Sequence, residues 1–155
     1  MTHAHSPIRR ISEDQFRNLL REEEKELLKI LPELVEEAIR MNSPYVTRLF
    51  PPTYPFDDSA QAKVEKCRSD SLAKQHMEVL GGFTKSINQE ILSVQDVATW
   101  VEALNDIRLL MGTALDVYED MDLPSENDPK FGDFVIYNYL AWLQSSLLEF
   151  LAHEA

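Results

Sequence analysis

The sequence is poor in several residues and patterns that identify common protein classes. Its single cysteine, Cys67, excludes an intrachain disulfide and fits a reducing compartment. Only 4 glycines occur among 155 residues, which disfavours an all-β fold rich in turns. No apolar run approaches the ~20 residues that cross a bilayer, and the first residues lack the apolar segment of a secretory signal. We therefore expect a cytoplasmic protein.

Positive charge is also scarce. The chain has 15 Lys and Arg residues against 27 Asp and Glu residues, so its formal net charge is −12. An acidic surface of this kind repels both the phosphate backbone of nucleic acids and the headgroups of anionic lipids. The sequence therefore predicts neither nucleic acid nor a membrane as a partner.

The usual signatures of catalytic sites are missing. The sequence contains no G-x-S-x-G, no Walker loop, no G-x-G-x-x-G and no H-E-x-x-H. On a continuous helix Cys67 would lie about two and a half turns from His76, too far for a nucleophile–base pair. A lone histidine on an apolar helix face is more often a core residue than a catalyst. We lean against an enzyme and expect no cofactor.

An acidic segment, 119–130, is the remaining candidate for ion binding. Its carboxylates lack the ligand order and the central glycine of an EF-hand loop. Acidic loops are usually only solvated surface. The sequence therefore predicts no metal site in this segment.

The residues that are present follow a helical pattern. Hydrophobic residues make up 44% and charged residues 27% of the chain, as in ordinary globular proteins, and the length suits one domain over 1–155. The apolar spacing predicts an all-α fold, a bundle of about five helices. They are expected at 21–41, 59–68, 71–88, 93–118 and 131–153, with a loose segment at 1–7, a loop rich in proline and aromatic residues at 42–58 and the acidic loop at 119–130.

The segment from Ile8 to Leu20 has two interpretations. Ser12 and Gln15 have the spacing of a capping box that would open a long helix. The same residues also fit a short β-hairpin, with Ile8–Ile11 against Gln15–Leu19 and a turn at Glu13–Asp14. Both interpretations are open at this point.

Three features of the earlier helices need tertiary support. Pro32 lies within the first expected helix, at a phase that faces solvent, and predicts a kink. His76 projects into the middle of an apolar stripe. Gly81 and Gly82 stand in mid-helix, which is tolerable only where packing holds the helix together.

The helix expected from Ser93 to Tyr118 organises the rest of the chain. Ser93 and Asp96 have the spacing of a helix cap. Helical phase places an apolar side against a wet side. The apolar side is Val97, Trp100, Val101, Leu104, Ile107, Met111, Ala114, Leu115 and Tyr118, and the wet side is Glu102, Asp106, Thr113 and Asp116.

Arg108 breaks the apolar side of this helix. Asn105 and Gly112 lie beside it, three residues before and four residues after, which are contact spacings on a helix. A guanidinium near a core needs an acceptor because an unpaired buried charge is unfavourable. The more common arrangement is a structural arginine that pairs with a carboxylate or carbonyl of a neighbouring helix. The alternative is an arginine that contacts an anion or another ligand.

The last expected helix is apolar over nearly its whole circumference. Its polar wedge consists only of Asn138, Ser145 and Glu149. A helix of this kind is surrounded on most sides, so it is either the central helix of the bundle or half of a homodimer interface. Gln144 lies among the apolar phases, and a buried amide needs partners. We expect Gln144 to meet Asn105 and Arg108 where the two helices cross.

Three motifs resemble a known family. They are L-N-D-I-R-L-L-M-G-T from Leu104 to Thr113, Arg48-Leu49-Phe50-Pro51 with Tyr54, and Leu140-Ala-Trp-Leu-Gln144. Together they resemble the uncharacterised actinobacterial family called domain of unknown function number two thousand and seventeen. The resemblance implies a small, mostly helical intracellular protein without an established activity, and it favours the hairpin at the N-terminus.

Two functional hypotheses follow. The first is a non-catalytic interaction or regulatory protein, which docks an unidentified protein partner through the apolar last helix or the loop from Tyr45 to Phe56. The second is a small-ligand or anion-binding protein, or an enzyme, built around Arg108, Asn105 and His76. The candidate binding residues are Asn105, Arg108, Gly112, Gln144 and His76.

Overall fold

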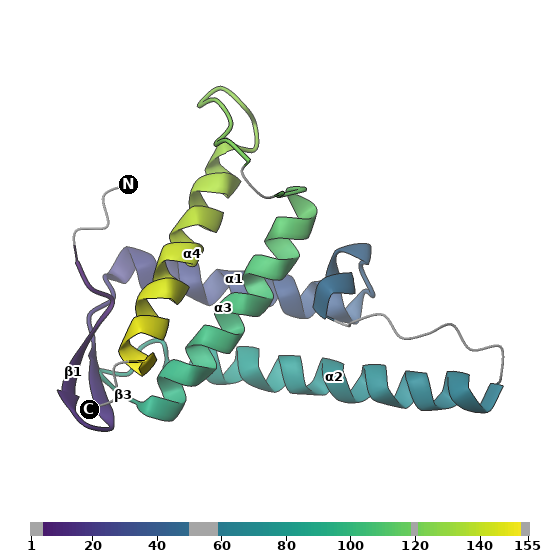
Figure 1. Ribbon diagram of the computed structural model, residues 1–155, viewed down its shortest axis with the longest axis horizontal. Helices are drawn as coiled ribbons and strands as arrows, with labels where there is room; N and C mark the ends of the chain where they lie inside the picture. The colour runs from purple at the N-terminus through teal and green to yellow at the C-terminus, as the bar shows by residue number, and fades with distance from the viewer. Residues whose placement is uncertain (1–4, 50–58, 119–120, 153–155) are drawn as a thin grey trace.

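The computed structural model of the chain describes residues 5–49, 59–118 and 121–152. Helix α3 lies at the centre and contacts α1, α2, α4, the 3-10 helix and one strand (Figure 1). The elements in chain order are β1 (Ile8–Ser12), β2 (Gln15–Asn18), α1 (Glu22–Arg40), the 3-10 helix η1 (Pro44–Leu49), α2 (Ser59–Ser86), β3 (Ile91–Ser93), α3 (Val94–Ala114) and α4 (Phe131–Ala152).

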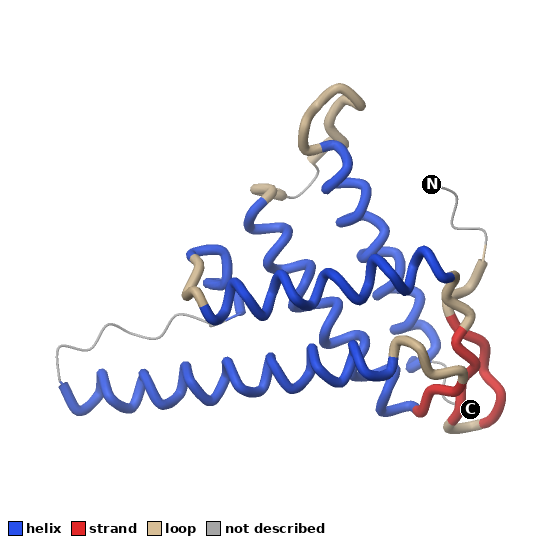
Figure 2. The backbone as a smooth tube through the Cα atoms, turned by 180° about the vertical axis from the view of Figure 1, so that it is seen from behind, coloured by secondary structure: helices blue, strands red, loops and turns tan. Residues whose placement is uncertain are grey.

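The N-terminal segment forms the hairpin, not a helix. Strands β1 and β2 pair antiparallel on either side of the Glu13–Asp14 turn. β2 then pairs antiparallel with β3, with Phe16 opposite Leu92, to give a three-stranded sheet at one end of the helices (Figure 2). The protein is therefore mostly helical but not all-α, and the third strand was not expected from the sequence.

The sheet is joined to the helices by hydrogen bonds from its central strand, β2, and from its edge strand, β1. Asn18 donates from Nδ2 to the carbonyls of Ile87 and Gln89, each at 2.9 Å, just beyond the end of α2. On the other side, Arg10 Nη2 donates to the Phe150 carbonyl at 3.0 Å, which satisfies an acceptor in the last turn of α4. The sheet thus closes the end at which α2, α3 and α4 converge.

Helix α1 runs without interruption through Pro32. Pro32 is buried, so the expectation that it faces solvent was wrong. The helix ends at Arg40, and Asn42 just beyond it has a φ of 51° that lets the Ser43 amide donate back to the Ala38 carbonyl at 2.9 Å. This is a Schellman cap, in which asparagine occupies the left-handed position that glycine usually takes.

The two helices expected between 59 and 88 are one helix, so the structure has four α-helices among its described residues. α2 continues through Gly81 and Gly82 to Ser86. A Cβ atom built on Gly82 would lie 3.3 Å from Thr99 Cγ2 of α3, whereas one built on Gly81 meets nothing within 4 Å. Gly82 therefore permits the close approach of α2 to α3.

Helix α3 ends earlier than its apolar pattern predicted. Ser93 caps its start by accepting the Asp96 amide at 3.0 Å. Its last residue is Ala114, and Asp116 adopts a φ of 57° so that the Val117 amide donates to the Gly112 carbonyl at 2.9 Å. Tyr118, expected in the apolar stripe, lies beyond this cap and is 66% exposed.

The proline-rich segment begins with regular structure, contrary to expectation. Residues 44–49 form η1, with Val46 and Leu49 buried and Tyr45 about half exposed. Tyr45 therefore does not belong to the buried core. The rest of this segment, 50–58, lies outside the described residues.

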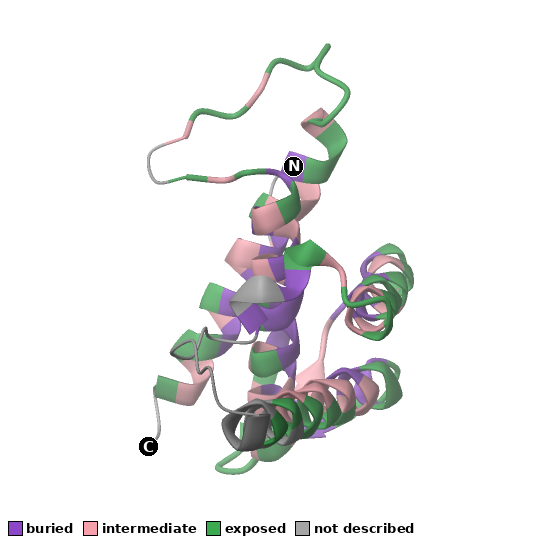
Figure 3. Ribbon diagram, turned by 90° about the vertical axis from the view of Figure 1, so that its right-hand side faces the viewer, coloured by how far each residue is buried: buried purple, intermediate pink, exposed green. Residues whose placement is uncertain are grey.

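The core lies between the facing sides of the helices (Figure 3) and includes Ile8, Phe16 and Leu92 of the sheet. Trp100 of α3 is fully buried, contacts Phe83 edge to face, and donates its indole N–H to Ser86 Oγ at 2.6 Å. α4 packs against α3 at the edge of this arrangement, with Leu148 47% exposed, so it is not the central helix. None of the helices in the described ranges is long and apolar enough to cross a bilayer.

Candidate functional site

A hollow crosses the exposed side of α3. We call it the α3 groove. Its volume is about 510 Å³, and Figure 1 shows α2 and α4 on opposite sides of α3. It is lined by Gln75, His76 and Val79 of α2, by Val101, Glu102, Asn105 and Asp106 of α3, and by Gln144 and Leu148 of α4.

The lining combines an apolar floor with a polar rim. Val79, Val101 and the exposed side of Leu148 supply apolar surface. The rim carries the exposed amides of Gln75 and Asn105 and the exposed carboxylate of Glu102, whereas the amide of Gln144 is buried. A volume above about 300 Å³ with a few convergent polar groups is typical of binding sites. Three of the five residues singled out from the sequence, His76, Asn105 and Gln144, line this groove, whereas Arg108 and Gly112 are not among its described lining residues.

His76 is held by two hydrogen-bond acceptors. Its Nδ1 lies 2.8 Å from Asp106 Oδ2, and its Nε2 lies 3.1 Å from the carbonyl oxygen of Leu49 in η1. Both contacts require an N–H on the ring, so the imidazolium satisfies them best. The hydrogen bond that His76 donates to Asp106 raises the pKa of His76, outweighing the opposing effect of burial. In this state neither nitrogen offers a lone pair to a substrate.

Asp106 was expected on the wet side of α3 but is buried, only 5% exposed. Its carboxylate faces α2, where His76 is its partner, and the His76–Leu49 hydrogen bond extends the connection to η1. A buried carboxylate is tolerated when it is paired and hydrogen-bonded. This pair therefore connects three elements that the chain brings together from separate regions.

Arg108 and Gln144 meet at the crossing of α3 and α4, as the sequence predicted. Arg108 Nη1 donates to Gln144 Oε1, and Gln144 Nε2 donates to the Val101 carbonyl at 3.2 Å. The guanidinium carbon of Arg108 also lies 5.5 Å from the ring centroid of Tyr137. Asn105 is exposed at the groove, and Gly112 is buried one turn beyond Arg108.

Sequence reasoning missed a second polar cluster, at the start of α1. Glu24 is 7% exposed and accepts hydrogen bonds from Tyr139 of α4, from the Arg21 amide at 3.0 Å and from His5 Nε2 at 2.8 Å. Burial acts to raise the pKa of Glu24, but these donors outweigh it, and the pKa is lowered. Burial and the nearby carboxylate raise the pKa of Tyr139. The available signal was the phase of Glu24, which falls on the apolar stripe of α1.

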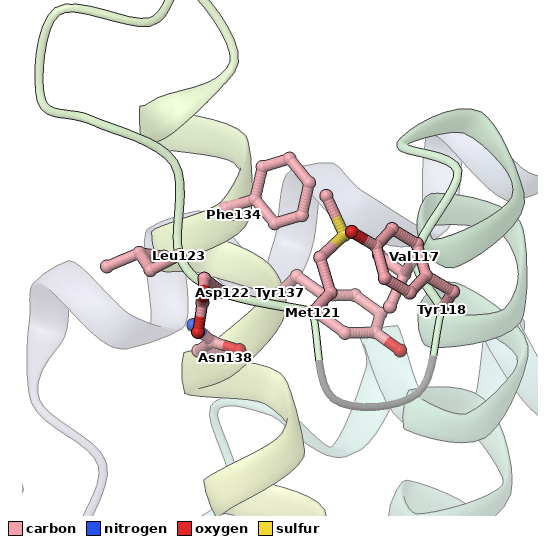
Figure 4. Close-up of a pocket in the computed structure, with 8 residues that line it drawn as sticks. All are labelled: Val117, Tyr118, Met121, Asp122, Leu123, Phe134, Tyr137 and Asn138. Atoms are coloured by element: carbon pink, nitrogen blue, oxygen red, sulfur yellow. The ribbon is translucent and has the colours of Figure 1, made fainter.

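A smaller hollow of about 160 Å³ lies between the end of α3 and the start of α4. In Figure 4 the Met121 side chain projects between the rings of Phe134 and Tyr118, with Tyr137 beside them. The volume is below that of ordinary small-molecule sites. We therefore interpret it as imperfect packing of the α3–α4 connection rather than as a binding site.

No group of three or more His, Cys, Asp or Glu residues is gathered closely enough to hold a metal ion in the part of the chain that the structure describes. The residues of the acidic connection that are described, 121–130, are mostly exposed and stand away from the helices (Figure 3).

Comparison with known proteins gives a family but no function. A family model described as "Domain of unknown function (DUF2017)" matches residues 6–151, nearly the whole chain. This is the family that the three sequence motifs resembled. No curated protein and no solved structure matches the chain.

Proposed function

The chain belongs to the DUF2017 family, and we propose that it is a non-catalytic binding module that recognises a segment of another protein in the α3 groove. The observation that carries the proposal is the groove, about 510 Å³ in volume, in which an apolar floor is framed by amides and one exposed carboxylate. Grooves between helices bind the apolar side chains of a partner, while rim groups fix its register.

Leu148 gives this surface a driving force for association. It is 47% exposed at the groove although it belongs to the apolar stripe of α4. Covering the exposed half of a leucine side chain contributes roughly 1 kcal/mol. The exposed amides of Gln75 and Asn105 each offer both a donor and an acceptor, so they can pair with the backbone of a docked segment.

The state of His76 supports binding over catalysis. A general base needs a nitrogen lone pair directed at the substrate. Both ring nitrogens of His76 instead face acceptors, Asp106 Oδ2 and the Leu49 carbonyl. The histidine therefore stabilises the wall of the groove rather than acting on what enters it.

The test is site-specific photo-crosslinking in the native host. A benzophenone amino acid is placed at Leu148 in the groove, and in a matched control at Ile30, an exposed apolar residue of α1 that does not line the groove. We expect a discrete crosslinked species at Leu148 that is absent at Ile30. It should disappear when Val101→Glu is added, because a charge on the floor opposes apolar docking.

The mass of the crosslinked species identifies the occupant. A foreign protein at Leu148 supports the proposal. A species of twice the chain mass would instead indicate a homodimer through α4 and overturn docking of a foreign partner. The same bands at Leu148 and Ile30, or none at Leu148, would also contradict it.

A further inference from the structure

Arg108 is electrostatically incomplete in the folded chain. Its neighbours are the neutral amide of Gln144 and the ring of Tyr137. Its Nε is buried, and the structure shows no acceptor for it among residues 5–49, 59–118 and 121–152. A guanidinium has five N–H donors and cannot lose its charge, so leaving a buried donor unpaired is unfavourable.

The surrounding sequence offers no carboxylate to complete it. The positions one turn away on α3 are Leu104, Asn105, Met111 and Gly112. Asp106 is the nearest acid in sequence, but its carboxylate is paired with His76 at 2.8 Å. The chain has 27 Asp and Glu residues and a net charge of −12, yet this half-buried arginine pairs with a neutral amide.

Gln144 connects this guanidinium to the α3 groove. It accepts from Arg108 Nη1 and is itself a lining residue of the groove. A glutamine side chain can rotate about its single bonds, and its amide oxygen is a weaker acceptor for a guanidinium than a carboxylate. A carboxylate that enters the groove can therefore take the place of Gln144 Oε1 at Nη1 and neutralise the charge of the guanidinium.

We infer that Arg108, provided that the α3 groove binds a partner as proposed above, receives the carboxylate of an aspartate or glutamate side chain on that partner. Arg108 is not among the described lining residues of the groove, so the carboxylate has to be carried on a flexible stem, as in an acidic side chain. Val79, Val101 and Leu148 then contact apolar residues that flank the acid. The recognised element is an apolar segment with a single acidic residue.

Two peptides that differ only in this group test the inference. Ac-Leu-Glu-Leu-NH₂ carries the carboxylate and Ac-Leu-Gln-Leu-NH₂ replaces it by an amide. Each is titrated into ¹⁵N-labelled protein at matched ionic strength, while the Nε–H signal of Arg108 is followed by NMR. We expect saturable shifts with the first peptide and binding at least about tenfold weaker with the second. Arg40, exposed on α1, is the internal control for nonspecific ionic effects.

A variant of Gln144 separates recognition from folding. Gln144→Glu places a carboxylate on Arg108 from within the chain. We expect this variant to unfold at a higher temperature than the wild type and to lose the Arg108 response to Ac-Leu-Glu-Leu-NH₂. A variant that retains that response would overturn the inference.

The remaining outcomes distinguish the inference from the proposed function. Equal shifts with both peptides, or an equal response at Arg40, would overturn the role of Arg108 while a Leu148 crosslink to a foreign protein would still support docking. Ac-Leu-Gln-Leu-OH tests a chain terminus as the source, and a response to this peptide alone would overturn the side-chain assignment. An Arg108 response without any crosslink at Leu148 would mean that the site takes free acids and that the proposed function fails.

Discussion

His76 of α2 and Asp106 of α3 form an ion pair across the interface between their helices, with Nδ1 2.8 Å from Oδ2. The other ring nitrogen, Nε2, lies 3.1 Å from the Leu49 carbonyl. One protonated side chain therefore holds α2, α3 and η1 together. The fold depends on that proton because a neutral ring can donate to only one of the two acceptors.

The first prediction is a loss of stability with rising pH. Asp106 raises the pKa of His76 above its ordinary value of 6.5. The folded chain therefore holds the proton more tightly than the unfolded chain. Its contribution to stability is complete below 6.5 and is lost as the pH rises through the higher folded-state pKa. Denaturant unfolding measured below and well above pH 6.5 should show the free energy of unfolding decrease.

The matched control for this prediction is Asp106→Asn. The amide keeps the shape of the carboxylate and removes the charge that raises the pKa of His76. We expect the variant to be less stable at low pH and to lose most of the dependence on pH above 6.5. An unchanged slope in the variant would assign the pH dependence to other groups.

The second prediction concerns the Glu24 cluster and has the opposite sign. The pKa of Glu24 is lowered in the folded chain, below its ordinary value of 4.5. Its contribution to stability is therefore present above 4.5 and is lost as the pH falls through the folded-state value. Tyr139→Phe removes one donor to this buried carboxylate and should reduce the free energy of unfolding by about 1–3 kcal/mol at neutral pH.

Glu24→Gln is the companion variant. It cannot carry the charge, so it should flatten the decline in stability between neutral and acidic pH. If Tyr139→Phe unfolds at the same denaturant concentration as the wild type, the hydrogen bond does not support the junction of α1 and α4.

The polar clusters around Arg108, Asp106 and Glu24 show which contacts the sequence can predict and which it cannot. The meeting of Arg108 and Gln144 was predictable because each interrupts an apolar stripe, and each stripe must pack against something. Asp106 was misplaced because helical phase treats an acidic residue as solvent-facing. Its burial depends on His76, which a distant segment supplies. Glu24 was not singled out, although its phase falls on the apolar stripe of α1, because its partner Tyr139 lies in a distant segment.

Element boundaries failed for local reasons. β3 has only three residues, too few to show an alternating apolar pattern, and its partner β2 lies far away in the sequence. The sequence did not predict the end of α3 correctly, because Asp116 occupies the left-handed position of the cap in place of the glycine that usually marks a helix end. The homodimer through α4 remains a prediction, although the alternative of a central α4 was wrong.

The third prediction follows from this cap. Asp116 has a φ of 57°, a conformation that favours glycine, and it places a negative charge at the carboxyl end of α3. Asp116→Gly removes both the backbone strain and the unfavourable negative charge. It should increase the free energy of unfolding by about 0.5–1 kcal/mol, measured by urea denaturation. Asp116→Ala, which removes the charge but keeps the strain, should gain less. Equal gains would show that the charge alone matters.

The last prediction uses the two adjacent glycines of α2. Alanine in a helix interior is about 0.5–1 kcal/mol more stable than glycine where space allows. A Cβ at Gly81 meets nothing within 4 Å, so Gly81→Ala should give this full gain. A Cβ at Gly82 would lie 3.3 Å from Thr99 Cγ2, so Gly82→Ala should gain less or destabilise the chain. Thr99→Ser removes that methyl group, and the gain from Gly82→Ala should be restored in a Thr99→Ser background. Thermal unfolding of the four variants measures the coupling, and equal effects of both glycine substitutions would mean that α2 and α3 do not pack as closely as the structure shows.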